Sequence, residues 1–100
     1  MKNKPVVIRR LAEVDLALAR KWYSQRNPAI VPQLEEAFDE VVTLLYQHPE
    51  AGTEVAPGIR RNLLGKFPYL VFCQTNSATR IIAILHGNLN PEEISARIGT

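Results

Sequence analysis

The sequence predicts an α+β fold in which a hairpin of two helices packs on an antiparallel sheet. Two observations carry this prediction. Residues 12–47 repeat apolar side chains every three or four positions, as helices do, with one break at Asn27-Pro28. Residues 59–85 instead alternate between the two faces of strands or run continuously apolar. The expected element order is β-α-α-β-β-β-α, in a single domain over residues 1–100.

The N-terminal half supplies one strand and two helices. Residues 6–11 are largely β-branched, which favours a strand, and residues 12–25 form the first helix. A second helix begins between Ile30 and Pro32, where proline is tolerated in the first turn, and it runs to about Gln47. The short connection makes the two helices antiparallel neighbours. The apolar faces expected to reach the core are Ala12, Leu16, Ala19 and Tyr23 on the first helix and Leu34, Phe38, Val41 and Leu45 on the second.

The C-terminal half changes to the two-residue period of strands. Residues 59–67 alternate between two faces until Pro68, which lacks a backbone donor, interrupts the strand. In a regular strand Arg60 and Lys66 share a face, and Arg61 points to the other. Two further strands are expected over residues 69–74 and 80–85, joined by a polar loop over residues 75–78. A short helix follows, with Asn90 as N-cap, Pro91 at its first position and Glu93 closing a capping box.

Composition excludes several classes of protein. Hydrophobic residues make up 46% of the 100 residues and charged residues 22%, which is typical of a folded domain. No apolar run approaches the roughly 20 residues of a membrane helix, and the run before Arg9 is too short for a secretory signal. We therefore expect a cytoplasmic protein without a membrane partner. Cys73 is the only cysteine, and the chain has no metal-ligand motif or nucleotide-binding loop, so no disulfide, metal or cofactor is expected.

Charged residues are segregated along the chain. Residues 31–50 contain acids but no lysine or arginine, whereas residues 55–91 contain bases but no acid. Guanidinium groups bind phosphates and carboxylates through paired hydrogen bonds, so a basic sheet face would hold nucleic-acid phosphates or an acidic partner segment. The alternative is that these residues are sheet-edge charges that discourage aggregation. The basic residues of this segment are Arg60, Arg61, Lys66 and Arg80.

Two further side chains are candidate functional groups. His86 follows the last predicted strand, and together with Arg60, Arg61 or Arg80 it would supply the base and the cations needed to cleave RNA through the 2′-hydroxyl. A hydrogen-bonded structural role for His86 is the alternative. Trp22 adjoins Tyr23, which the helical period turns toward the core, so Trp22 either marks an exposed partner surface or borders the core.

A series of short motifs occurs in a fixed order along the chain. The motifs are Ala12, Asp15-Leu16, Trp22-Tyr23, Pro49, Gly52, Ile59-Arg60-Arg61, Phe67-Pro68-Tyr69, residues 81–85, His86-Gly87, Pro91 and Arg97. In this order they resemble the ParE-type toxins of the RelE/ParE superfamily, and the resemblance covers nearly the whole chain. The superfamily fold, an α-hairpin on an antiparallel sheet, agrees with the predicted element order.

The resemblance implies the toxin of a bacterial type II toxin–antitoxin system, of the kind used in plasmid stabilization. Such a toxin inhibits DNA gyrase as a binding protein rather than as an enzyme. It is neutralised by a cognate, ParD-like antitoxin, and the complex binds operator DNA only through the antitoxin. On this interpretation the partner-binding residues are Arg60, Arg61, Lys66, Arg80, Trp22, Tyr69 and Arg97.

Two alternatives remain open at the level of sequence. RelE-like relatives cut mRNA on the ribosome, and the catalytic candidates for that activity are His86, Arg60, Arg61 and Arg80. The chain ends without the C-terminal aromatic or histidine of those ribonucleases. The family usually carries basic residues after the His-Gly pair, but here residues 88–90 are Asn-Leu-Asn. This departure makes a non-toxic antitoxin-binding module the third interpretation.

Overall fold

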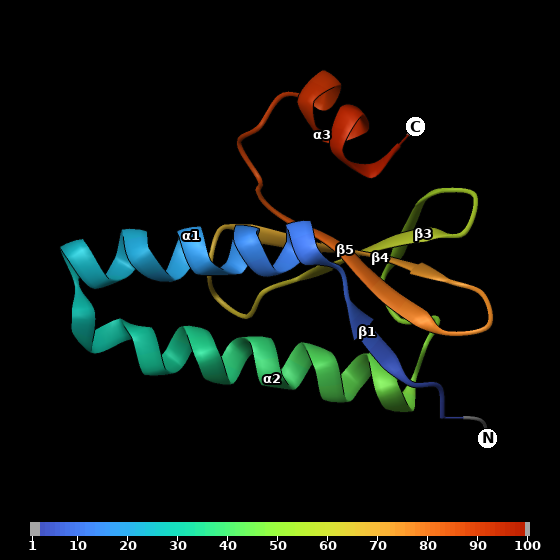
Figure 1. The fold of residues 1–100 in the computed structure, drawn as a ribbon, viewed down its shortest axis with the longest axis horizontal. Helices are drawn as coiled ribbons and strands as arrows, with labels where there is room; N and C mark the ends of the chain where they lie inside the picture. The colour runs from blue at the N-terminus through green and yellow to red at the C-terminus, as the bar shows by residue number, and fades with distance from the viewer. Residues whose placement is uncertain (1–2, 100) are drawn as a thin grey trace.

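A computed structural model describes residues 3–99 and shows two helices on one side of a five-stranded sheet and a third helix on the other (Figure 1). The predicted α+β class and the order of the predicted elements are confirmed. The elements are β1 (Val6–Ile8), α1 (Arg10–Arg26), a single 3-10 turn (Pro28–Ile30), α2 (Val31–Gln47), β2 (Thr53–Ala56), β3 (Ile59–Leu63), β4 (Tyr69–Thr75), β5 (Thr79–His86) and α3 (Pro91–Ile98).

The strands lie in the order β1-β5-β4-β3-β2. Strands β3 to β5 form the expected antiparallel meander, and β2 extends it. Strand β1 pairs in parallel with β5, so the complete sheet is mixed. Strand β2 was not expected, because its mostly exposed sequence Thr-Glu-Val-Ala has no apolar face. Strand β1 ends at Ile8 rather than at residue 11, because Arg10 and Leu11 already belong to α1.

The segment between β3 and β4 departs from the prediction. Strand β3 ends at Leu63 rather than at residue 67. The chain then turns at Gly65, whose φ of +57° suits glycine, and the N–H of Phe67 donates to the carbonyl of Leu64 at 3.0 Å. Lys66 therefore lies in this turn, and the expectation that it shares a strand face with Arg60 is wrong.

The principal core lies between the helical hairpin and the sheet. Its helical members include the apolar faces expected from the sequence, although Tyr23 is only partly buried. Cys73 is fully buried in this core, and burial raises the pKa of its thiol. The sheet residues of this core are Val71, Cys73, Ile81 and Ile84.

A second, smaller core lies on the opposite face, under α3. Phe72, Ala83 and Leu85 are buried there against Ile94 and Ile98 of α3 and three other partly buried residues. A β-bulge in β5 changes which of its side chains point to each face of the sheet, since Phe72 pairs with Ala83 but Cys73 pairs with Ile81. As a result, Ile81 and Ile84 both belong to the principal core although they are three residues apart.

Helix α3 begins where the sequence predicts. The side chain of Asn90 accepts a hydrogen bond from the N–H of Glu93 at 2.8 Å, the carboxylate of Glu93 accepts from the N–H of Asn90, and Gly99 closes the helix with a φ of +83°. Among residues 3–99, no helix is long and apolar enough to cross a membrane.

Candidate partner-binding surface

An exposed row of large apolar side chains runs along α1. Leu11, Val14, Leu18 and Trp22 are 61%, 45%, 61% and 47% exposed. Their spacing of three, four and four residues places them on one side of the helix. The core-facing side of α1 is instead occupied by Ala12, Leu16 and Ala19. This α1 stripe (Leu11, Val14, Leu18 and Trp22) is the kind of exposed apolar patch that marks a protein–protein contact.

The C-terminal end of the α1 stripe opens into a cleft of about 400 Å³. Leu18 and Trp22 form one wall, and Tyr69 and His86 come from the adjoining ends of β4 and β5. Burial raises the pKa of Tyr69 above its ordinary value. Its hydroxyl, like that of any tyrosine at neutral pH, is protonated and can donate a hydrogen bond. The structure thus brings together Trp22, Tyr69 and His86, which are far apart in the sequence.

Aromatic contacts hold Trp22 in place although its ring is half exposed. The ring centroids of Trp22 and Tyr23 lie 4.9 Å apart in an edge-to-face arrangement. The guanidinium of Arg26 lies over the indole, 4.1 Å from the ring centroid. Tyr23 in turn packs edge-to-face on Phe67. A large side chain held in one orientation loses little entropy when a partner covers it.

A polar network beneath the α1 stripe joins α1, β5 and α3. The Asp15 side chain is only 10% exposed, and its carboxylate accepts a hydrogen bond from the N–H of Ile84 at 3.0 Å. It also receives two hydrogen bonds from Arg97, at 3.0 and 2.7 Å, and this pairing raises the pKa of Arg97. Arg97, a predicted partner-binding residue, is therefore engaged within the chain, where it holds α3 beside α1.

The arginines of the sheet are divided between its two faces. Arg60 pairs with Cys73, on the face covered by the hairpin, and its guanidinium donates to the carbonyl of Gly52 at 3.2 Å. Arg61 pairs with Phe72, on the face that carries α3, and is exposed. Adjacent strand residues do point to opposite faces here, as the sequence predicts.

Arg80 lies on the same sheet face as Arg61. It pairs with Gln74, two residues along β4 from the Phe72 that pairs with Arg61, and β4 residues two apart share a face. The guanidinium of Arg80 donates to the side-chain oxygen of Asn76 at 2.6 Å.

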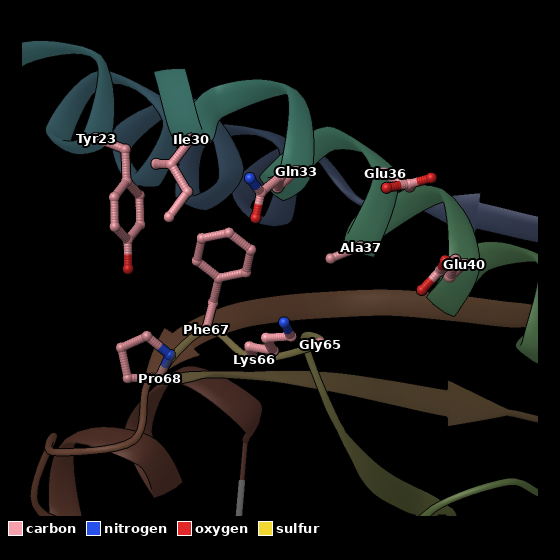
Figure 2. Close-up of a pocket in the computed structure, with 10 residues that line it drawn as sticks. All are labelled: Tyr23, Ile30, Gln33, Glu36, Ala37, Glu40, Gly65, Lys66, Phe67 and Pro68. Atoms are coloured by element: carbon pink, nitrogen blue, oxygen red, sulfur yellow. The ribbon is translucent and has the colours of Figure 1, made fainter. Parts of the chain in front are cut away.

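Lys66 lines a different cleft, between α2 and the turn that joins β3 to β4 (Figure 2). This cleft measures about 470 Å³. Figure 2 shows Phe67 rising from the turn toward Ile30, with Glu40 on the helix above Lys66. Gly65 allows the turn to approach α2 closely, because a Cβ at this position would lie 3.0 Å from the Cβ of Ala37.

The structure does not assemble the ribonuclease set considered for His86. The Nδ1 atom of His86 accepts the N–H of Asn88 at 3.0 Å, so this nitrogen is already used in the loop that leads to α3. His86 pairs with Tyr69, whereas Arg60 pairs with Cys73, four residues and about 13 Å further along β4. Arg61 and Arg80 lie on the sheet face that carries α3, opposite the face of Arg60. Across residues 3–99 there is also no cluster of side chains suited to a metal ion.

Two parts of this surface were missed by sequence reasoning. Leu11, Val14 and Leu18 were not singled out, although the sequence does show a second apolar row on the first helix, offset by one residue from the alanine-rich row that is buried. The pairing of Asp15 with Arg97 had no local signal, because 82 residues separate the two side chains.

Comparisons with known proteins agree with this geometry. The family model described as "ParE toxin of type II toxin-antitoxin system, parDE" matches residues 6–91. A solved structure titled "Chromosomal ParDE TA system from P. aeruginosa" is similar in fold, with a TM-score of 0.72. That similarity covers 83% of this chain and 95% of the other, at 22% sequence identity. None of the curated protein sequences matches this chain.

Proposed function

Because this chain belongs to the ParE toxin family of type II toxin–antitoxin systems, we propose that it is a toxin that binds and inhibits DNA gyrase and is neutralised by a ParD-like antitoxin. The proposed action is binding without catalysis, in the cytoplasm. The exposed α1 stripe is the observation that carries this proposal, because a protein inhibitor needs a surface for its partners rather than a reaction centre. Recognition of operator DNA sequences is assigned to the antitoxin.

The antitoxin is proposed to lay an amphipathic segment along α1. Burial of a large apolar side chain contributes about 1.5–3 kcal/mol, and the four stripe residues each have roughly half of their surface left to bury. Covering the α1 stripe therefore contributes about 4 kcal/mol before ordering costs. Trp22 is the expected energetic centre, since indole rings fixed beside a cleft commonly dominate protein interfaces.

The basic residues are proposed to add charge complementarity around this apolar contact. Arg60 and Lys66, on the hairpin side of the sheet, are the candidates for acidic side chains of the antitoxin or of gyrase. Arg61 and Arg80, on the opposite face, are candidates for other negatively charged groups of the target complex. Tyr69 offers its hydroxyl in the cleft beside Trp22. Arg97 contributes through Asp15, by keeping α3 in place.

The gyrase proposal is tested with a supercoiling assay on purified components. We expect the chain to inhibit gyrase and the ParD-like protein encoded beside it to restore supercoiling. Trp22→Ala should weaken antitoxin binding at least tenfold in calorimetry. Tyr46→Ala is the matched control, because Tyr46 is 46% exposed on α2 and lies outside the α1 stripe. Intact supercoiling at a large excess of the chain would overturn the gyrase assignment.

The same material distinguishes the two alternatives. Cleavage of message in a translating extract, lost on substitution of Arg60, Arg61 or Arg80, would assign the chain to ribosome-dependent mRNA endonucleases. Growth unaffected at every expression level, together with tight antitoxin binding, would identify a non-toxic binding module. In both cases the α1 stripe remains the proposed antitoxin site, and the Trp22→Ala and Tyr46→Ala pair still tests it.

A further inference from the structure

Four arginines gather on the sheet face that carries α3. Arg61 and Arg80 project from β3 and β5 on this face. Two strand spacings and two residues separate them, which places their Cα atoms about 12 Å apart. Arg9 and Arg10, where β1 leads into α1, line a cleft of about 340 Å³ together with Gln74, the pairing neighbour of Arg80. We call these four residues the arginine band.

The positive charge of the arginine band is not neutralised within the described chain. Over residues 3–99 the salt bridges are Arg20 with Glu35 and Arg97 with Asp15, and neither includes a residue of the band. Strands β1, β3, β4 and β5 contain no acidic residue. The acidic residues of α2 lie on the hairpin, which covers the other sheet face (Figure 1). Glu92 and Glu93 do lie on the side of the band, in the first turn of α3, but the cleft that Arg9 and Arg10 line is bordered by the last residues of that helix. The side that carries the band therefore has fewer acidic residues than the hairpin side.

The shape of the band matches a continuous polyanion better than single carboxylates. Its four charges are spread over two strands, β3 and β5, and the junction of β1 with α1, so no single acidic side chain could contact more than part of it. One strand of duplex DNA carries a phosphate every 3.4 Å along the axis, and it presents several charges over the 12 Å between Arg61 and Arg80. All four residues are arginines, whose planar groups keep their charge and suit phosphate oxygens. The start of α1, where Arg9 provides no side-chain cap, adds further positive potential.

We propose that the arginine band binds the phosphodiester backbone of DNA directly, without reading its sequence. This contact goes beyond the proposed inhibition of gyrase and does not depend on it, because it needs neither gyrase nor antitoxin. If the proposed function holds, the band faces the DNA that gyrase engages, and it adds affinity for the enzyme–DNA complex over the free enzyme. Leu18 and Trp22 of the α1 stripe remain available for the antitoxin, since they lie toward the other end of α1, whereas Leu11 lines the same cleft as Arg9 and Arg10.

The test is the salt dependence of DNA binding by the purified full-length chain. Fluorescence anisotropy of a labelled 20-base-pair duplex measures affinity between about 50 and 200 mM NaCl. Four phosphate contacts give a slope of about −3.6 in log affinity against log salt, or a loss of about 150-fold over this range. Arg61→Gln with Arg80→Gln removes two contacts, which reduces the slope to about −1.8 and the loss to about 12-fold.

A charge-matched control separates the band from the net charge of the protein. Arg26→Gln removes one positive charge at the far end of α1, 16 residues and about 24 Å from Arg10. Its slope should equal that of the unmodified chain, whereas Arg61→Gln alone should lower the slope by about 1. Thermal unfolding and circular dichroism confirm that each variant is folded.

Three outcomes would overturn the proposal. One is the absence of DNA binding at about 50 mM salt and 100 µM protein, a concentration at which nonspecific contacts are detectable. Another is an equal loss of slope in Arg26→Gln and Arg61→Gln. The third is preferential binding of a polyglutamate peptide over the duplex, which would show that the band takes an acidic protein segment. Failure of gyrase inhibition alone leaves the DNA-binding result unaffected, so the two proposals fail separately.

Discussion

Replacing Asp15 by alanine tests the polar network that joins α1, β5 and α3. The substitution leaves the N–H of Ile84 without an acceptor and removes both hydrogen bonds of Arg97. A hydrogen bond to a charged group contributes about 1.5–3 kcal/mol, and an unsatisfied buried N–H costs about 1–3 kcal/mol. The Arg97 side chain is 31% exposed, so water replaces part of what it loses. We therefore expect the free energy of unfolding to fall by about 3 kcal/mol.

Thermal and urea unfolding measure this loss. For a domain of this size 1 kcal/mol corresponds to about 4–8 °C, so Asp15→Ala should lower Tm by about 15 °C. Arg97→Ala leaves the bond from Ile84 to Asp15 intact and should cost less, about 1–2 kcal/mol. The double variant should cost less than the sum of the two single changes, because both remove the same pair.

Hydrogen exchange supplies a readout that is specific to the network. The amide of Ile84 donates to the Asp15 side chain, so its exchange should accelerate strongly in Asp15→Ala and little in Arg97→Ala. The hydrogen bonds to Asp15 raise the pKa of Arg97 above its ordinary value. The stabilisation is present below the unfolded pKa and is lost only as pH rises through the folded one, so the effect of Asp15→Ala should not change near neutral pH. An unchanged Tm together with normal protection of Ile84 in Asp15→Ala would refute this reasoning.

Three other predictions concern local features. Gly52→Ala should destabilise the fold by about 2 kcal/mol in urea titration, because the new Cβ would overlap the carbonyl oxygen of Arg61 and φ is +98°; wild-type stability would contradict the close approach. The pKa of Glu35 is lowered by its hydrogen bond from Arg20, so the pair stabilises the fold above the unfolded pKa and is lost as pH falls through the folded one. In Glu35→Gln the free energy of unfolding should therefore fall slightly less steeply as the pH is lowered, and the effect is small because both side chains are about 40% exposed. An unchanged dependence of stability on acid pH would rule this out. Cys73 should resist thiol reagents in the native protein and react once urea unfolds it; rapid native labelling would show that it is not buried.

Much of the local structure could be read from the sequence, because neighbouring residues specify it. The capping box of Asn90 and Glu93 forms within four residues, and the helix breaks at Asn27 and His48 follow from the prolines beside them. The buried faces of α1 and α2 follow from the helical period. The same reasoning failed at Lys66. The alternation of side chains in the sequence continues through Gly65, but in the structure the chain turns at this glycine.

The candidate site depended on contacts that no local pattern contains. Trp22, Tyr69 and His86 share one cleft because β4 and β5 end beside α1, and Asp15 meets Arg97 across 82 residues. The two-residue period of a strand showed that Arg60 and Arg61 lie on opposite faces of the sheet. The sequence did not show which of these faces the helical hairpin covers. Except for β2, the sequence alone determined the type of each element and the apolar side that it presents, because those depend on side chains a few positions apart. Only the tertiary structure decided that the second apolar row of α1 stays uncovered, because that depends on which surfaces the remaining elements occupy.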